Sequence, residues 1–423
     1  MVKLVIISDD FTGALDTGVQ FAGKNIKTKV ITDLSKEVLA ENERYSVLVV
    51  SADTRCRSGR EAYSKVRRIA ESAADGGVPY LFKKTDSALR GNIGSELEAV
   101  LDAAGEKVLT FVPAFPKMGR FTKEGVQYLG DKPVHLTEFG KDPYEPVRQS
   151  RVRDIVKEQY AGAVIEKGRK APLFLSHDAG EKTIVIYDAA TDEDMEEIAE
   201  QLAGQETAAM AGCARLADAL SKVLRLEKRQ RVAADPRPPL LVICGSVFPV
   251  TKRQLAYGES HGFIRISLGR RDRIIPDFVR TKRGKEFLAQ AWQQLQSGRP
   301  VLIDTMDQEE DGEIAPSPEE KQALRKVIAD NLGCVARSLL RRGTNRTLMV
   351  IGGDTLKTVM EKLDCSGVEP VAEVFDGTVL FYLDTEFGEL PVLSKSGGFG
   401  HEALLTDLEK MLEEQGGKAQ YGS

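Results

Sequence analysis

Short apolar, β-branched runs alternate with amphipathic stretches along the whole chain, and this rhythm restricts the fold more than any other feature. Runs of about four to six apolar residues with polar flanks are typical of strands covered on both faces, as in a parallel sheet. Alternation of such strands with helices predicts βαβ units, in which a helix connects two parallel strands. The predicted fold class is therefore α/β.

The predicted strands and helices fall into two halves. In the first half the strands are KLVIIS, TKVIT, SVLVVS, YLFKKT, KVLTFV and KTIVIYD, and the helices cover residues 13–24, 59–74, 94–103 and 192–203. In the second half the strands are LLVICG, FIRISL, PVLIDT, TLMVIGG, GTVLFYL and PVLSKSG, and the helices cover residues 318–341, 354–363 and 404–414.

Between these halves, the charged and proline-rich segment LEKRQRVAADPRPPL at 226–240 is typical of a domain boundary. A chain of 423 residues is also long for one hydrophobic core. The sequence predicts two α/β domains with mainly parallel sheets, one at residues 1–230 and one at residues 238–423.

Composition narrows the class of protein. With 42% hydrophobic and 29% charged residues the chain suits a soluble enzyme or binding protein, and its net charge of −5 gives no reason to expect a nucleic acid as partner. The five cysteines and four histidines are scattered without CxxC spacing, which disfavours a structural zinc site and fits reduced thiols. No apolar h-region or stretch of about 18 apolar residues is found, so we expect a cytoplasmic protein with no membrane partner.

Charged and hydroxyl side chains follow the predicted strands of the first half. Asp9 and Asp10 end KLVIIS, and Arg55 follows SVLVVS. YLFKKT leads into a polar group that suits a carboxylate or a polyol, made of Lys84, Thr85, Asp86, Ser87 and Arg90. FVPAFPKMGR adds a rigid, proline-bearing turn beside Arg120. Each charge alone could belong to a solvated loop, and the Asp pair could simply cap a helix. Because the carboxyl ends of parallel strands are where α/β proteins bind ligands, the cluster favours a binding site.

Glycine-rich turns follow three strands of the second half. They contain Ser246 after Gly245, then Gly352, Gly353, Asp354 and Thr355, and finally Gly397, Gly398 and Gly400 after Lys395. Glycine lets the backbone approach a phosphate, and helix N-termini and backbone nests favour anions. Tight βα turns with good caps would look similar, and no turn matches the P-loop spacing GxxxxGK[ST] or the dinucleotide spacing GxGxxG. Three such turns in one domain predict nucleotide binding by another design.

Six motifs in order resemble the four-carbon acid sugar kinases. VIISDDFTGALDTGVQFA is similar to the opening of that family, and KKTDSALRGNIGSEL and FVPAFPKMGRFTKEGVQYLGDKPVHLTEFGKDPYEPVRQS are similar to its next two segments. VICGSVFPVTKRQL, IGGDT and LSKSGGFG follow in the order of the family's second half. The resemblance covers nearly the whole chain. One departure is Arg215, which stands where the family often has a glycine.

The resemblance implies ATP-dependent phosphorylation of a four-carbon sugar acid, with the active site in a cleft between an acid-sugar domain and an ATP domain. It implies that Asp10, Arg55 and residues 84–87 hold the sugar acid, with Arg55 or Lys84 neutralising its carboxylate. It implies that Ser246, residues 352–355 and the glycines of 397–400 hold ATP. Mg²⁺ is expected with ATP, because phosphoryl transfer depends on charge stabilisation. Asp10 and Asp86 both fit the role of general base, and Asp9 is expected to orient the turn or bind magnesium; no set of metal ligands is assigned.

Several alternatives stay open at this point. The resemblance favours D-threonate, converted to 4-phospho-D-threonate, with D-erythronate, L-threonate and 3-oxo-tetronate as alternatives. A sensor that binds a sugar acid without catalysis is a further hypothesis, and so is a nucleotide-dependent ligase or dehydrogenase, although the missing GxGxxG disfavours a nicotinamide cofactor. A homodimer is expected only as the commonest oligomeric state.

Overall fold

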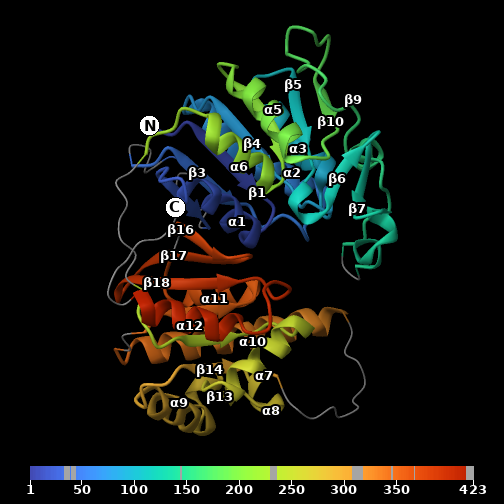
Figure 1. Cartoon of the computed structure of the whole chain (residues 1–423). Helices are drawn as coiled ribbons and strands as arrows, with labels where there is room; N and C mark the ends of the chain where they lie inside the picture. The colour runs from blue at the N-terminus through green and yellow to red at the C-terminus, as the bar shows by residue number, and fades with distance from the viewer. Residues whose placement is uncertain are drawn as a thin grey trace. The chain divides into compact units, whose positions relative to one another are not determined.

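The computed structural model describes residues 1–32, 39, 44–142, 145–228, 236–306, 318–343, 346–365 and 367–415. The chain divides into two compact units, Met1–Gln230 and Arg231–Ser423 (Figure 1). Each unit is an α/β structure built around a mainly parallel sheet, which confirms the predicted fold class.

In the part of unit 1 that the structure describes, eight strands pair in parallel in the order β2-β3-β1-β4-β11-β5-β10-β9. Their bounds are β1 Leu4–Ser8, β2 Thr28–Ile31, β3 Val47–Ser51, β4 Tyr80–Lys84, β5 Val108–Val112, β9 Ala163–Lys167, β10 Thr183–Tyr187 and β11 Ala208–Gly212. After β5 comes a small antiparallel sheet of β6 Arg120–Lys123, β7 Val126–Leu129 and β8 Lys132–Pro133.

Helices cover both faces of the unit 1 sheet. Along β1, Val5 and Ile7 point to one face, where they share a core with Val66 and Leu97. That face is covered by α2 Gly59–Asp75, α3 Ile93–Ala103 and α4 Val152–Lys157. The other helices of the unit, α1 Phe11–Ala22, α5 Asp192–Ala203 and α6 Ala214–Val223, lie side by side in Figure 1, and α6 packs on both α1 and α5.

Unit 2 has its own sheet, in the order β13-β14-β12-β15-β18-β17-β16. The first five strands pair in parallel, and β16 and β17 add an antiparallel edge. The strands are β12 Leu241–Cys244, β13 Ile264–Ser267, β14 Val301–Asp304, β15 Leu348–Ile351, β16 Gly367–Phe375, β17 Thr378–Thr385 and β18 Gly388–Lys395. The helices are α7 Pro249–Ser260, α8 Arg270–Arg273, α9 Lys282–Leu295, α10 Pro318–Leu340, α11 Gly353–Lys362 and α12 Leu404–Gln415.

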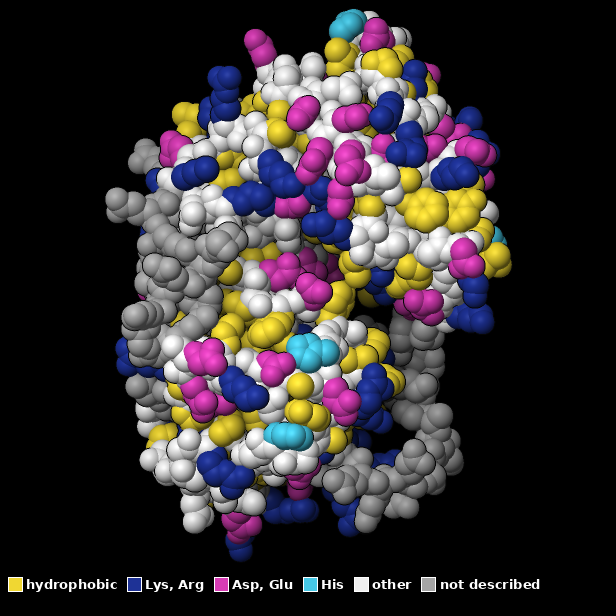
Figure 2. All heavy atoms as spheres, in the orientation of Figure 1, with side chains coloured by type: hydrophobic (Ala, Val, Ile, Leu, Met, Phe, Trp, Pro, Cys, Tyr) yellow, Lys and Arg dark blue, Asp and Glu magenta, His cyan; other side chains and the backbone are white. Residues whose placement is uncertain are grey.

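Surface charge is mixed. On the face shown in Figure 2, acidic and basic side chains of unit 1 are interspersed, with no broad patch of one sign. Among the described helices, none combines the length and the apolar character needed to cross a bilayer.

Close packing in unit 1 depends on a glycine at the start of α3. A Cβ atom added at Gly94 would lie 2.2 Å from the carbonyl oxygen of Val156, in α4. Real Cβ atoms do not approach a backbone oxygen so closely, so α3 and α4 would have to separate if this glycine were replaced.

We therefore expect Gly94→Ala to destabilise the protein by about 1–3 kcal/mol, as overpacked cores do, although alanine is the better helix former. The midpoint of thermal unfolding, measured by circular dichroism, should fall by roughly 2–4 °C for each kcal/mol. Gly168→Ala is the matched control, because nothing lies within 4 Å of a Cβ at that position. Equal unfolding midpoints for the two variants would contradict the packing argument.

Candidate functional site

Parallel pairing brings the polar strand ends of unit 1 together. β3, β1 and β4 are neighbours in the sheet, so the residues that follow them meet at one edge. Arg55 lies at the centre: its Nε donates to Asp9 Oδ2 at 2.7 Å, and its Nη1 is 2.6 Å from Asp10 Oδ2. Its Nη2 lies 3.9 Å from Asp86 Oδ1. The amide of Thr54 donates to the carbonyl of Asp9 at 2.9 Å, which joins the two loops directly.

The two adjacent aspartates differ in exposure and in their hydrogen-bond partners. Asp10 is the N-cap of α1 and accepts from the amide of Gly13 at 2.8 Å, which explains why the helix begins two residues before the predicted start at 13. Its side chain is 29% exposed, whereas that of Asp9 is 3% exposed. Burial opposes the charge of Asp9, but Arg55 and the two lysines of β4 outweigh it and lower the pKa of Asp9. Asp10 is therefore the acid that a ligand can reach.

Asp86 is held by Arg90 through two parallel hydrogen bonds, Nε to Oδ2 at 2.9 Å and Nη2 to Oδ1 at 3.0 Å. The guanidinium of Arg90 also lies over the ring of Phe139, 5.2 Å from its centre. Burial opposes the ionisation of Asp86, but the charges of Arg55 and Arg90 outweigh it and lower its pKa strongly. An acid that is ionised and paired with arginine in this way is a weak proton acceptor at neutral pH.

The paired lysines at the end of β4 point to opposite faces of the sheet, as successive strand residues do. Lys83 is fully buried, lies 2.9 Å from Glu96 Oε2 and donates to the carbonyl of Lys84 at 2.6 Å. Burial raises the pKa of Glu96, although Lys83 acts in the opposite direction. Lys83 and Glu96 thus form a structural ion pair beneath the site.

Lys84 has no such partner. Lys84 is only 6% exposed, and no hydrogen bond or ion pair joins its Nζ to any described residue. A Cβ atom at Gly13 would lie 2.5 Å from Asp10 Oδ1, 2.8 Å from this Nζ and 3.0 Å from the hydroxyl of Ser8, which also lacks a partner among the described residues. The glycine lets the N-terminus of α1 lie close to Lys84, the Ser8 hydroxyl and the Asp10 carboxylate. A lysine without a hydrogen-bond partner beside a helix N-terminus favours an anion.

The remaining predicted residues lie nearby. The amide of Thr85 donates to the carbonyl of Gly212 at 2.8 Å, and its buried hydroxyl has no partner among the described residues. Ser87 accepts a hydrogen bond from Arg120, whose guanidinium lies 5.1 Å from the centre of the Phe139 ring. Burial lowers the pKa of Arg120.

Arg120 was singled out in the sequence but not included among the predicted site residues. It belongs to the small sheet of unit 1, which the sequence did not predict, and only the sequence resemblance could have connected its segment with the edge at β4. Asn92 was missed as well: its Nδ2 donates to the carbonyls of Thr54 at 3.0 Å and Arg57 at 2.8 Å, and so holds the loop that carries Arg55.

Arg215, the departure from the family pattern, lies in the first turn of α6 in unit 1. It is 3% exposed and donates to acids of α5 and α6, namely Asp192, Glu196 and Asp218. The arginine therefore acts as a bridge between these two helices.

In unit 2 the three glycine turns follow β12, β15 and β18, which are neighbours in the sheet. The hydroxyl of Thr251 donates to the carbonyl of Gly397 at 2.7 Å and lies 3.1 Å from that of Ser246. A Cβ atom at Gly397 would lie 2.2 Å from Ser246 Oγ, so the first and third turns touch.

The middle turn contacts the first. Gly352 is the N-cap of α11 with φ +114° and has no side chain to accept from the first amides of this helix, which among the described residues have no side-chain cap. A Cβ at Gly245 would lie 2.1 Å from Thr355 Oγ1, so Thr355 is turned inward, whereas Asp354 is exposed in the first turn. Gly400 has φ +83°, a left-handed conformation that suits glycine.

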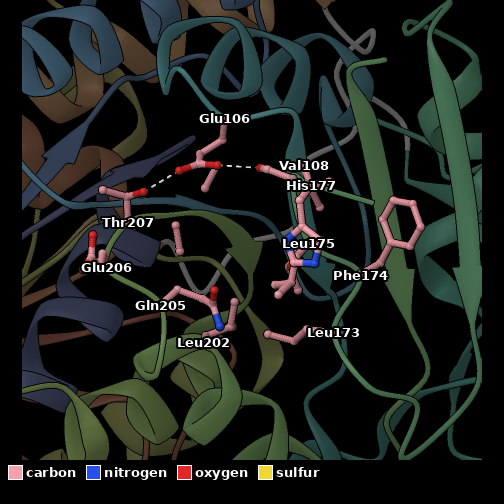
Figure 3. Close-up of a pocket in the computed structure, with 14 residues that line it drawn as sticks. Glu106, Val108, Leu173, Phe174, Leu175, His177, Leu202, Gln205, Glu206 and Thr207 are labelled. Carbon is pink, nitrogen blue, oxygen red and sulfur yellow. Dashed lines mark hydrogen bonds between the residues drawn. The ribbon is translucent and has the colours of Figure 1, made fainter. Parts of the chain in front are cut away.

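A cavity of about 290 Å³ lies at the opposite edge of the unit 1 sheet (Figure 3). It is lined by residues at the amino ends of β5 and β11 and by the loop of residues 173–177. The carboxylate of Glu106 accepts from Ser176 at 2.5 Å and also from Thr207. These hydrogen bonds already satisfy the carboxylate of Glu106, so this acid has a structural role. The carboxyl edge of the sheet therefore remains the candidate site.

The residues described in the structure include no group of three or more His, Cys, Asp or Glu side chains arranged to hold a metal ion. Asp9, which was considered as a magnesium ligand, is buried against Arg55. An Mg²⁺ ion that enters with a nucleotide needs few protein ligands, because it is bound largely by phosphates and water.

Known proteins match the chain over almost its whole length. A family model described as a sugar-binding N-terminal domain matches residues 4–220, and one described as a nucleotide-binding C-terminal domain matches residues 241–405. A D-threonate kinase of Salmonella typhimurium is 30% identical and covers 98% of this chain and 99% of its own. A D-erythronate kinase of Heliobacterium modesticaldum is 31% identical and covers 97% and 98%.

A solved structure from Haemophilus influenzae has the same fold, with a TM-score of 0.72 at 19% identity over 96% of this chain and 100% of that one. The two family models, their order along the chain and the kinase relatives agree with the six motifs and with the two sets of strand-end residues. The chain belongs to the four-carbon acid sugar kinases.

Proposed function

We propose that the chain transfers the terminal phosphoryl group of ATP to D-threonate and forms 4-phospho-D-threonate. The observation that carries the proposal is the buried, unpartnered Lys84 beside the N-terminus of α1, in the unit that matches the sugar-binding model. Identity to D-threonate and D-erythronate kinases is nearly equal, at 30% and 31%, so it does not choose between the stereoisomers. The preference for D-threonate rests on the opening motif alone.

Lys84 is the cation best placed to bind the substrate carboxylate. Lys84 is buried, and no hydrogen bond or ion pair joins its ammonium group to a described residue, although the charges of Asp9 and Asp86 act on it. The amides at the start of α1 would add hydrogen bonds to a bound anion. Arg55 was predicted to share this role. Its guanidinium already serves Asp9 and Asp10, so we assign it chiefly to holding those acids in place.

Asp10 is the better general base of the two candidates. The pKa of Asp86 is lowered, and both of its oxygens accept hydrogen bonds from Arg90, whereas Asp10 keeps a partly exposed carboxylate at the same edge. A carboxylate can accept from two adjacent hydroxyl groups of a polyol and remove a proton from one of them as phosphoryl transfer proceeds. Asp86 would then orient Arg90 and bind substrate hydroxyl groups.

The three glycine turns of unit 2 would hold the phosphates of ATP. Their free amides and the N-terminus of α11 suit an anionic group, and the turns lie in the part that matches the nucleotide-binding model. Mg²⁺ bound with ATP would neutralise charge on the transferred phosphoryl group. The expected cleft, the homodimer and the role of magnesium stay predictions.

A panel of acids tests the proposed reaction. We expect D-threonate to give the highest kcat/KM in an ADP-coupled assay that also contains D-erythronate, L-threonate and 3-oxo-tetronate. Highest activity with another member would move the assignment to that acid. Binding of an acid without ADP formation would support the sensor hypothesis and contradict a kinase.

Lys84→Met should raise the KM for the sugar acid by roughly 10- to 150-fold, because a charge-assisted hydrogen bond contributes about 1.5–3 kcal/mol. The KM for ATP should change little. Lys107→Met is the control, since Lys107 is exposed at the amino end of β5. Arg55→Ala should also weaken binding of the acid and leave ATP binding nearly intact. Unchanged acid affinity in a folded Lys84→Met variant would refute the assigned carboxylate site.

Gly398→Ala tests the phosphate turns. No atom lies within 4 Å of a Cβ at this exposed position, so the thermal unfolding midpoint should stay the same. If phosphates approach this backbone, the methyl group will obstruct them and raise the KM for ATP or abolish turnover. A normal KM for ATP would show that the phosphates bind elsewhere.

A further inference from the structure

We infer that Lys395 is a positioning residue for nucleotide binding: it gathers the carbonyl groups of the glycine loop 396–400 and thereby directs the loop's amides to the phosphates. The inference rests on the proposed use of ATP. In a P-loop the lysine itself reaches the phosphates. Lys395 also lies in a glycine-rich turn, but we assign it to the loop carbonyls and not to the phosphates.

The ammonium group of Lys395 lies inside the loop. Its Nζ donates to the carbonyl oxygens of Ser396 at 2.9 Å, Phe399 at 3.0 Å and Gly397 at 3.4 Å. The residue is 2% exposed, and its three donors have three backbone acceptors. A side chain with this burial and these partners has no donor left for a phosphate.

Two side chains of α7 bind the same carbonyl groups or their neighbours. Thr251 donates to the carbonyl of Gly397 at 2.7 Å. The Nε2 of Gln254 donates to the carbonyls of Phe399 at 3.0 Å and His401 at 2.9 Å. Lys395, Thr251 and Gln254 therefore satisfy the oxygen atoms of the loop from the protein interior.

The amides of the loop are left available. The amide of Phe399 donates to the carbonyl of Ser396 at 3.3 Å, whereas those of Gly397, Gly398 and Gly400 donate to no other residue that the structure describes. Gly398 is exposed. A loop whose carbonyls are bound on one side and whose successive amides are free has the features of an anion-binding nest.

Removal of the ammonium would free these carbonyl groups. Burial lowers the pKa of Lys395 to about 8, so at neutral pH it still carries the three protons that match its three acceptors. A methionine of similar length would fill the space but remove one donor from each of the three oxygens, so that the carbonyls of Gly397 and Phe399 keep only Thr251 and Gln254 as side-chain donors. The loop would then sample conformations in which carbonyls, rather than amides, face the phosphates.

The test compares ADP binding by calorimetry in the full-length wild type, Lys395→Met and Lys410→Met, an exposed lysine of α12 that serves as the matched control. We expect Lys395→Met to weaken ADP binding by roughly 10- to 100-fold, as the loss of charge-assisted hydrogen bonds implies. In turnover assays the KM for ATP should rise much more than kcat falls, and the KM for the sugar acid should stay unchanged.

Hydrogen exchange separates positioning from direct contact. In the absence of nucleotide, amides 397–401 should exchange faster in Lys395→Met than in wild type, which a lysine that only contacts phosphate would not cause. Gln254→Leu should change ADP affinity and exchange in the same direction by a smaller factor, and it decides the matter if Lys395→Met does not fold. Wild-type ADP affinity in a folded Lys395→Met variant would overturn the inference. If Lys395→Met does not fold, wild-type ADP affinity in Gln254→Leu would overturn it. Failure of the wild type itself to bind ADP would instead refute the proposed function.

Discussion

Parallel strand pairing is the constraint on which the candidate site depends. It places the carboxyl ends of β3, β1 and β4 side by side in unit 1, and those of β12, β15 and β18 side by side in unit 2. Residues as distant in the sequence as Asp10, Arg55 and Asp86 therefore meet at one edge. Because helices cover the sheet on both faces, the carboxyl edge is where the polar side chains that follow these strands gather.

Within each unit, charge pairing separates structural groups from groups that await a ligand. In unit 1, Arg55 and Arg90 are neutralised by aspartates and Lys83 by Glu96, whereas no hydrogen bond or ion pair joins the ammonium group of the buried Lys84 to a described residue. In unit 2, Lys395 is equally buried but fully occupied by loop carbonyls. We therefore propose opposite roles for these two strand-end lysines: Lys84 offers its charge to a ligand, and Lys395 orients the loop backbone.

The sequence predicted most of the framework because its strands are β-branched and its helices are periodic; β1, β3, β12 and β15 all lie where expected. It missed β11, whose sequence AAMAG has no β-branched residue and is a strand only because β4 and β5 flank it. It also missed the small sheet β6–β8, which adds Arg120 to the site. The strand ends and the motifs predicted the residues of both candidate sites apart from Arg120 and Asn92, and that assignment stays a prediction. The individual roles of these residues were not predicted, because the partners of Arg55, Lys84 and Lys395 depend on side-chain directions in the folded sheet.

The most direct measurement is an experimental structure of the protein with bound D-threonate. We expect the carboxylate at the N-terminus of α1, within hydrogen-bonding distance of Lys84 Nζ, with a hydroxyl group against Asp10. Arg55 should remain paired with Asp9 and Asp10. A carboxylate bound instead by Arg90 or Arg120, with Lys84 still unpartnered, would contradict the central claim that the free lysine at this strand end defines the acid-binding site.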